Sequence, residues 1–193
     1  CLSGHPNVCT ANPTARPRGA GPRLRAGDET VRGFLNLGTF AEEMNVYAKS
    51  LVTLPDSVSD DESPLACGGL TAYGAVKKLF KHGVLPGRTV AIVGAAGGLG
   101  HYAVQIAKAY GYKVAGIDVG PERLAFIESL GADWAIDASE AATVLGKDMG
   151  GADGCLVFAA RISGFQLGFK VLRRGGIYVA VGIPPASEGP IQL

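Results

Sequence analysis

The sequence predicts an α/β fold over residues 63–193, in which helices cover both faces of a parallel, doubly wound sheet. Three observations predict this fold. Short apolar runs alternate with stretches of helical periodicity, and such alternation is typical of parallel sheets. A glycine-rich turn separates the first apolar run from the helix that follows it. Proline at helix starts and glycine just beyond helix ends mark the boundaries, as at Pro121 and Gly131.

The alternation gives five strands and five helices. A sheet made of two complete halves has six strands, so we expect the fold to be incomplete at its C-terminal end. The expected helices are 64–81, which Ser63 and Pro64 open, 99–110, 121–130, 139–146 and 163–172, and the expected strands are 89–93, 113–117, 134–136, 155–159 and 177–181.

Residues 1–62 lack this alternation, so we expect them to belong to a separate unit. Within them, residues 38–54 alternate partially between apolar and polar side chains and predict a strand. Residues 10–37 contain three prolines and five arginines without a sustained period, which favours a loop or no fixed structure. Arginines without interleaved aromatic side chains are more typical of a solvated loop than of an RNA contact.

The composition excludes several classes of function. Hydrophobic residues make up 47% of the chain and the formal charge is +1, so we expect neither a disordered chain nor nucleic acid or an anionic membrane as a partner. Glycine and charged residues interrupt every apolar run before it reaches the length of a membrane span. Four scattered cysteines and the absence of a secretory signal favour a reducing compartment, so we expect a cytoplasmic protein that acts on small molecules.

Residues 89–118 are the most informative segment. An apolar strand leads into a glycine-rich turn and then an amphipathic helix. Glycine lets a pyrophosphate approach backbone N–H groups that a Cβ atom would shield, and the helix N-terminus adds positive charge. Glycines that only permit tight packing are the alternative interpretation, but the flanking strand and helix favour a dinucleotide site. The turn consists of Gly94, Ala95, Ala96, Gly97, Gly98, Leu99 and Gly100.

Asp118 ends the next strand, eighteen residues beyond Gly100. A carboxylate at about this spacing accepts hydrogen bonds from the ribose hydroxyls of a dinucleotide and repels a 2′-phosphate. The sequence therefore predicts NAD as the cofactor in preference to NADP. That preference depends on one residue.

The cysteines and histidines give weaker signals. Seven residues separate Cys1 from Cys9, a spacing compatible with a disulfide, half of a metal site or coincidence. Cys67 lies near the start of a helix and Cys155 within an apolar strand, and both positions suit a small buried residue. No histidine has a carboxylate or nucleophile nearby in sequence, so we expect surface or capping positions for all three, His5, His82 and His101.

Together these motifs resemble the zinc-containing alcohol dehydrogenases of the medium-chain dehydrogenase/reductase superfamily, most of all the tetrameric microbial and yeast-type ethanol dehydrogenases. The resemblance covers almost everything except residues 10–37. It implies a Rossmann NAD-binding domain over residues 63–193 and a remnant of a β-rich, GroES-like catalytic domain over residues 1–62. The matching segments are CLSGHPNVC, GTFAEEM, LPDSVSDDESPLACGGLTAYGAVKK, GAAGGLG, the strand ending at Asp118, and VAVGIPP.

The resemblance implies roles for individual residues at the zinc sites and at the nicotinamide. Cys67 matches a ligand of the catalytic zinc. Cys1 and Cys9 match two of the four cysteines that hold the family's structural zinc. Thr71 matches a residue that lies against the nicotinamide.

Further matches concern the cofactor. The turn from Gly94 to Gly100 matches the pyrophosphate loop, and Asp118 matches the ribose carboxylate. Arg123 stands where the family has a lysine that reaches the adenosine ribose. The backbone segment that receives the carboxamide corresponds to Val181, Gly182 and Ile183.

The implied reaction is hydride transfer between a primary or secondary alcohol and NAD, with zinc activating the alcohol oxygen. The family's other catalytic zinc ligands, its proton relay and its first two structural cysteines lie upstream of the position that Cys1 matches, and its sixth strand lies downstream. We therefore expect a fragment of a homo-oligomeric parent that binds NAD weakly and does not turn over alcohol by itself. Two alternatives stay open: a zinc-free quinone or enoyl reductase of the same superfamily, and a non-catalytic NAD-binding module.

Overall fold

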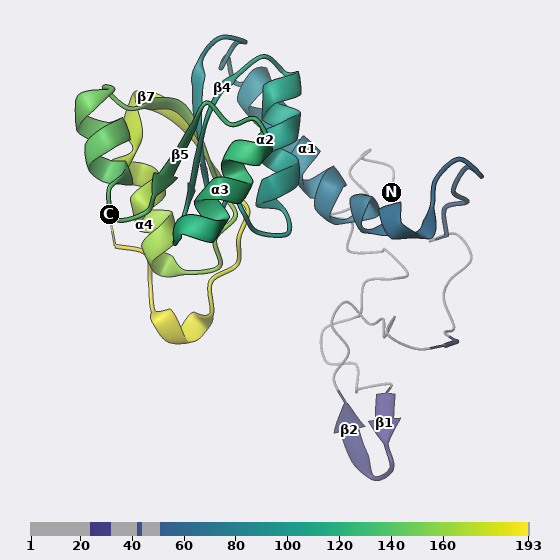
Figure 1. Cartoon of the computed structure of the whole chain (residues 1–193). Helices are drawn as coiled ribbons and strands as arrows, with labels where there is room; N and C mark the ends of the chain where they lie inside the picture. The colour runs from purple at the N-terminus through teal and green to yellow at the C-terminus, as the bar shows by residue number, and fades with distance from the viewer. Residues whose placement is uncertain (1–23, 32–41, 44–50, 193) are drawn as a thin grey trace. The chain divides into compact units, whose positions relative to one another are not determined.

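The chain divides into two compact units, Cys1–Val58 and Ser59–Leu193. The structure is a computed structural model and describes residues 24–31, 42–43 and 51–192 (Figure 1). The second unit contains the larger sheet and begins at Ser59, whereas the sequence predicted a boundary before Ser63.

The described residues of the first unit include a β-hairpin. Strand β1 (Leu24–Ala26) pairs antiparallel with strand β2 (Glu29–Val31), and Gly27 and Asp28 connect them. The expectation of a loop or no fixed structure over residues 10–37 is therefore wrong for this part. Gly27 has a φ of +61°, and a glycine followed by aspartate suits a two-residue hairpin turn.

The described part of residues 38–54 does not contain the predicted strand. The structure describes only residues 42–43 and 51–54 of this segment, and these form no strand. The remaining residues of the segment lie outside the described residues. So do Cys1, His5 and Cys9.

Five parallel strands form the sheet of the second unit, in the order β5-β4-β3-β6-β7. The chain moves from the central strand β3 to one edge of the sheet, and then crosses to the other side of β3 for the last two strands. The predicted parallel, doubly wound sheet is confirmed. Its strands are β3 (Thr89–Val93), β4 (Lys113–Asp118), β5 (Trp134–Asp137), β6 (Ala152–Val157) and β7 (Leu172–Ala180).

Helices cover both faces because side chains along each strand alternate between two apolar clusters. Val90 and Ile92 of β3 face one cluster, and Ala91 and Val93 face the other. Each fully buried valine or isoleucine contributes about 1.5–3 kcal/mol. None of the described helices is both long and apolar enough to cross a membrane. The first face carries α1 (Gly68–Lys81), α2 (Gly100–Ala109) and α3 (Pro121–Ser129), and the second carries η5 (Ala142–Asp148) and α4 (Ile162–Lys170).

The first predicted helix begins differently from the expectation. Residues 60–66 form a 3₁₀ helix, η4 (Asp60–Ala66), and α1 begins only at Gly68. The Ser59 N–H donates to the Glu62 carboxylate at 2.8 Å, so the helical turn starts before Pro64. Pro64, which has no N–H to donate, lies inside η4, and the chain changes from the 3₁₀ helix to α1 at Cys67.

Three later elements are shifted along the chain. Helix η5 is a π-helix that begins at residue 142 instead of 139, and the Met149 N–H donates to the Val144 carbonyl five residues earlier. Strand β6 ends at Val157 because the N–H groups of the next two residues, Phe158 and Ala159, both donate to the Val93 carbonyl. Strand β7 begins at residue 172 instead of 177, since it pairs with β6 on both sides of a local irregularity in the register.

Candidate functional site

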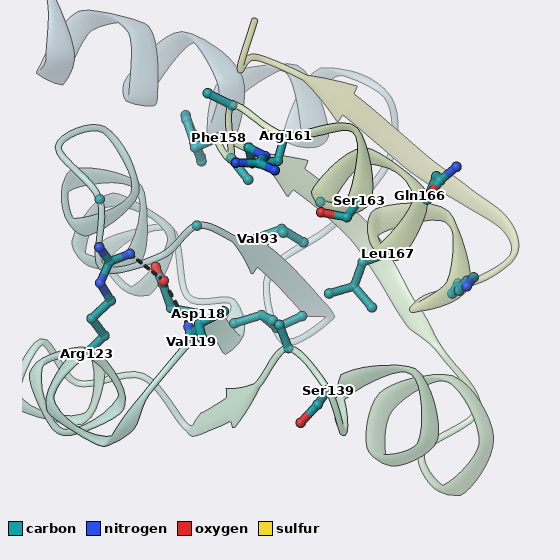
Figure 2. A pocket seen from close by; sticks show the side chains of 18 of the residues that line it. Val93, Asp118, Val119, Arg123, Ser139, Phe158, Arg161, Ser163, Gln166 and Leu167 are labelled. Atoms are coloured by element: carbon teal, nitrogen blue, oxygen red, sulfur yellow. Dashed lines mark hydrogen bonds and ion pairs between the residues drawn. The ribbon is translucent and has the colours of Figure 1, made fainter. Parts of the chain in front are cut away.

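A cavity of about 730 Å³ opens at the carboxyl ends of the parallel strands (Figure 2). Its floor includes Val93, the last residue of β3, and β3 has β4 on one side and β6 on the other. The strands that follow β3 in the chain lie first on one side of β3 and then on the other, so the strand order reverses at β3. In doubly wound sheets, ligands bind in the crevice at such a position.

The turn after β3 is held by backbone hydrogen bonds. The N–H groups of Gly94 and Ala95 both donate to the Ile117 carbonyl of β4, at 2.9 and 3.1 Å. The Gly97 N–H donates to the Gly94 carbonyl at 3.2 Å. The turn that the sequence predicted over residues 94–100 is therefore present, and backbone hydrogen bonds hold it to the neighbouring strand and close it on itself.

The glycines of this turn serve different purposes. Gly94 has a φ of +81°, and a Cβ there would lie 2.9 Å from the Ala159 amide nitrogen. A Cβ on Gly100 would overlap the Gly94 carbonyl and lie 2.7 Å from Ala95 Cα. These two glycines permit close packing. At Gly98, by contrast, a Cβ would meet no atom within 4 Å, so this position leaves room for a group from outside the fold.

Three N–H groups at the start of α2 have unused donor capacity. Among the residues that the structure describes, the N–H groups of Gly98, Leu99 and Gly100 donate to no backbone or side-chain acceptor. The first N–H groups of a helix lack partners within the helix and carry the positive end of its dipole. This end of α2 is suited to bind an anion.

Asp118 lies beside the turn, at the end of β4, and is 7% exposed. Its Oδ2 accepts the Ala96 N–H at 2.9 Å, and its Oδ1 accepts the Val119 N–H at 2.9 Å. The carboxylate therefore fixes the glycine turn in addition to lining the cavity. The predicted position at the end of the second strand is confirmed.

Arg123 reaches from α3 to the same carboxylate, and Figure 2 shows the two side chains pointing toward each other. The Arg123 Nη1 atom lies 2.9 Å from Asp118 Oδ1. The Arg123 side chain is 63% exposed, whereas that of Asp118 is 6% exposed. Both line the cavity, so the structure brings together these two residues of the predicted site.

The opposite wall comes from residues that the sequence analysis missed. They follow the carboxyl ends of β5 and β6 or lie on α4, around Leu167 (Figure 2). Some of these residues directly follow a predicted strand. That position is the one signal in the sequence that could have identified them, because ligands of such sheets bind at the carboxyl ends of the strands. The residues are Ala138, Ser139, Ala142, Phe158, Ala159, Ala160, Arg161, Ser163, Gly164, Gln166, Leu167 and Lys170.

Two carboxylates fix polar residues of this wall. The Ser139 hydroxyl donates to Asp137 at 2.7 Å, and this bond, with the Ser139 N–H, holds the pKa of Asp137 below its ordinary value. Glu188 lies in the 3₁₀ helix η6 (Ala186–Glu188), and its carboxylate is 2.6 Å from Arg161 Nε. The same carboxylate accepts the N–H of Ile162, the first residue of α4, at 2.8 Å.

The segment of Val181, Gly182 and Ile183 follows β7. The N–H groups of Val181 and Gly182 both donate to the Val157 carbonyl at 2.9 Å, and a Cβ on Gly182 would overlap the Ala159 carbonyl. This segment therefore packs closely against the end of β6. Ile183 is 80% exposed. None of the three lines the 730 Å³ cavity formed by the described residues, so their role at a carboxamide stays a prediction.

Cys67 and Thr71 lie at the start of α1, where the Thr71 N–H donates to the Cys67 carbonyl at 3.0 Å. Cys67 is an exposed free thiol, so the interpretation as a small buried residue is wrong. Within residues 24–31, 42–43 and 51–192, no three His, Cys, Asp or Glu side chains form a group that could hold a metal ion. The described residues therefore do not fit a zinc ion at Cys67.

Among the described residues, the other cysteine is buried and the two histidines lie at helix ends, as the sequence predicted. Cys155 is fully buried in β6, and burial raises the pKa of its thiol. His82 is the exposed C-cap of α1. The His101 Nδ1 atom lies 3.0 Å from the Gly97 carbonyl oxygen, at the start of α2.

Comparisons with known proteins extend these observations. Residues 98–193 match the family model described as zinc-binding dehydrogenase. An alcohol dehydrogenase from Geobacillus stearothermophilus is 36% identical over 196 residues, which cover 100% of this chain and 52% of that protein. The solved alcohol dehydrogenase from Aeropyrum pernix has a TM-score of 0.72 and 34% identity, over 82% of this chain and 47% of that one.

A third relative comes from another class of enzyme. The quinone oxidoreductase of Thermus thermophilus, which was solved in complex with NADPH, has a TM-score of 0.61 and 34% identity, over 75% of this chain and 46% of that one. The chain spans about half the length of the curated relatives it matches. The family match begins inside the glycine turn and continues through β4, β5, β6 and β7. Residues 98–193 therefore match the zinc-binding dehydrogenase family, and the chain belongs, with the alcohol dehydrogenases, to the medium-chain dehydrogenase/reductase superfamily.

Proposed function

We propose that the second unit binds NAD in the cavity at the carboxyl ends of the strands, as the cofactor of an alcohol dehydrogenase. The observation that carries the proposal is the start of α2. There the unpartnered N–H groups of Gly98, Leu99 and Gly100 adjoin the open space at Gly98. A pyrophosphate offers several acceptor oxygens and a negative charge, and backbone N–H groups at a helix N-terminus complement both.

Asp118 supports the adenosine half of the proposal. Its carboxylate lines the same cavity, at the end of the strand next to the turn. In dinucleotide-binding sheets a carboxylate at this place accepts the ribose hydroxyls, and its charge opposes a 2′-phosphate. Gly94 and Gly97 of the turn line this cavity together with Asp118, so the ribose contact lies beside the turn that leads to the proposed phosphate contact.

When bound, the nicotinamide of NAD accepts a hydride from the carbon that bears the alcohol oxygen. The chain holds the dinucleotide in place and shields it from water, since hydride transfer requires a close and fixed approach. By resemblance, Thr71 lies against the nicotinamide and the segment from Val181 to Ile183 binds its carboxamide. Both roles are part of the proposal.

Zinc belongs to the proposal at the level of the family. The family name and the resemblance support zinc, with Cys67 at the catalytic site and Cys1 and Cys9 at the structural site. The described residues do not fit the metal at Cys67, and Cys1 and Cys9 lie outside them. We therefore assign no catalytic step to zinc.

A second candidate is a quinone oxidoreductase of the same superfamily. The Thermus thermophilus relative favours it, because it has the same sheet at 34% identity. Cys67 favours the alcohol dehydrogenase, since a zinc-free reductase has no need of a cysteine at this position. Nicotinamide absorbance of the expected parent protein, measured with ethanol and NAD and with a quinone and NADPH, distinguishes the two activities.

The binding proposal is tested with Gly98→Ala, titrated with NADH by nicotinamide fluorescence. The added Cβ enters open space, so we expect the melting temperature of the wild type, but an affinity for NADH weaker by about tenfold because the methyl group takes the place of the phosphate. Gly74→Ala is the matched control. Gly74 lies within α1, also has open space at Cβ, and is remote from the turn in sequence.

The outcomes separate clearly. Weaker NADH binding in Gly98→Ala, together with wild-type binding in Gly74→Ala, supports a cofactor at the start of α2. Equal affinity in all three proteins contradicts the phosphate position. A wild type that does not bind NADH contradicts the proposed function.

A further inference from the structure

We propose that Arg123 weakens the discrimination between NAD and NADP that Asp118 sets, by competing with NAD for the carboxylate and by offering a cation to a 2′-phosphate. The inference rests on the proposed function. It assigns to Arg123 a part in cofactor specificity in addition to a contact with the adenosine ribose.

The first step is the occupancy of the Asp118 carboxylate. A carboxylate accepts about four hydrogen bonds, two at each oxygen. Oδ1 accepts the Val119 N–H and Arg123 Nη1, both at 2.9 Å, and Oδ2 accepts the Ala96 N–H at 2.9 Å. Among the described donors three positions are thus taken, and one position on Oδ2 is left.

The second step is that Arg123 is the one donor of the three that is free to leave. The Ala96 N–H belongs to the turn that is fixed to β4, and the Val119 N–H follows Asp118 directly in the chain. Arg123 holds Oδ1 through a long side chain that is 63% exposed. An ion pair with so exposed a partner is easily exchanged.

The third step concerns NAD. Its adenosine ribose has two hydroxyl groups, and both can donate to Asp118 only if Oδ1 becomes available. NAD binding therefore displaces Arg123 from Oδ1, and the lost ion pair lowers the affinity. A side chain of similar length without donors removes this competition.

The fourth step concerns NADP. A 2′-phosphate that faces an unpaired carboxylate is repelled, but here the guanidinium already compensates the charge of Asp118. Once released, the guanidinium suits a phosphate better than an ammonium does, because it donates two parallel hydrogen bonds. Arg161 and Lys170 line the same cavity and add positive charge, although Arg161 is paired with Glu188.

The test compares the dissociation constants of NADH and NADPH, measured by nicotinamide fluorescence at low ionic strength, in the full chain and in Arg123→Met. We expect NADH to bind a few-fold more tightly and NADPH at least about tenfold more weakly than in the wild type. Arg174→Met is the matched control. Arg174 is also exposed, and it lies on β7 and does not line the cavity.

A second pair of variants shows whether Arg123 acts through Asp118. In the background of Asp118→Asn, where there is no charge to compete for, Arg123→Met no longer improves NADH binding. Equal NADH-to-NADPH ratios in the wild type and Arg123→Met, or weaker NADH binding in Arg123→Met, overturn this inference and leave the proposed function intact. A wild type that binds neither nucleotide overturns both.

Discussion

The two ends of the five-stranded sheet use aspartates differently. At the carboxyl ends, Asp118 lines a cavity of about 730 Å³ and holds an exposed arginine. At the amino ends, Asp153 accepts the Thr89 N–H at 3.0 Å and Arg173 Nε at 2.8 Å, and so connects β3, β6 and β7. The cavity beside Asp153 is smaller, about 270 Å³.

The partners of each carboxylate explain the difference. Asp153 and Asp133 accept strand N–H groups and cations from their own fold, so their charge stabilises the sheet. Asp118 also accepts two backbone N–H groups, but its third partner is an exposed side chain that can be exchanged for a ligand. Asp153 also has an exposed arginine partner, since the Arg173 side chain is 45% exposed, and it lines a cavity. What distinguishes Asp118 is its place at the carboxyl ends of the strands, beside the glycine turn and the larger cavity.

Removing the structural carboxylate should have the largest effect on stability. Asp153→Ala leaves the Thr89 N–H without its acceptor and removes the ion pair with Arg173, so we expect a loss of about 2 kcal/mol in the free energy of unfolding. Urea unfolding followed by circular dichroism measures it. A loss below about 0.5 kcal/mol would show that Asp153 does not hold the strands together.

A smaller and pH-dependent effect is expected at Asp133. Burial raises the pKa of Asp133, but the hydrogen bonds from Lys108 and from the Val114 N–H outweigh it and hold the pKa below its ordinary value. Because the folded pKa is lowered, the stabilisation is present above the unfolded value of about 3.9 and is lost as the pH falls through the folded value.

The variant Asp133→Asn isolates this contribution. The Asp133 side chain is 33% exposed, so solvent screening limits the loss in the free energy of unfolding at pH 7 to about 1 kcal/mol. Urea unfolding at pH 7 and at a pH near 2 should show the wild type and the variant converging in acid. A difference that stays constant with pH would mean that the Asp133 charge is not its source.

The sequence predicted those parts of the fold that local patterns determine. The five strands, the turn of residues 94–100 and the carboxylate that ends β4 all follow from apolar periodicity and glycine placement. The hairpin at residues 24–31 also has a local signal, the Gly27-Asp28 pair, but the arginine-rich composition around it favoured a loop.

The remaining contacts join residues far apart in sequence. Asp153 and Thr89 are separated by 64 residues, and Glu188 and Ile162 by 26. Such pairs have no period and no short motif, because they arise only when the sheet brings the strand ends together. The ion pair of Arg123 with Asp118 is different, because it joins residues only five positions apart. The sequence does not predict it, since the resemblance assigns each of the two side chains to the cofactor and not to the other.

The central claim is that a dinucleotide binds at the carboxyl end of the sheet and that the amino end serves the fold. NADH titrations of Asp118→Asn and Asp153→Ala, side by side with the wild type, test it most directly. We expect Asp118→Asn to weaken NADH binding by about tenfold, because it removes the charge that accepts the ribose hydroxyls. Asp153→Ala should bind NADH within about twofold of the wild type at a temperature where it is fully folded. Equal losses of affinity in the two variants, or undiminished binding in Asp118→Asn, would contradict the account.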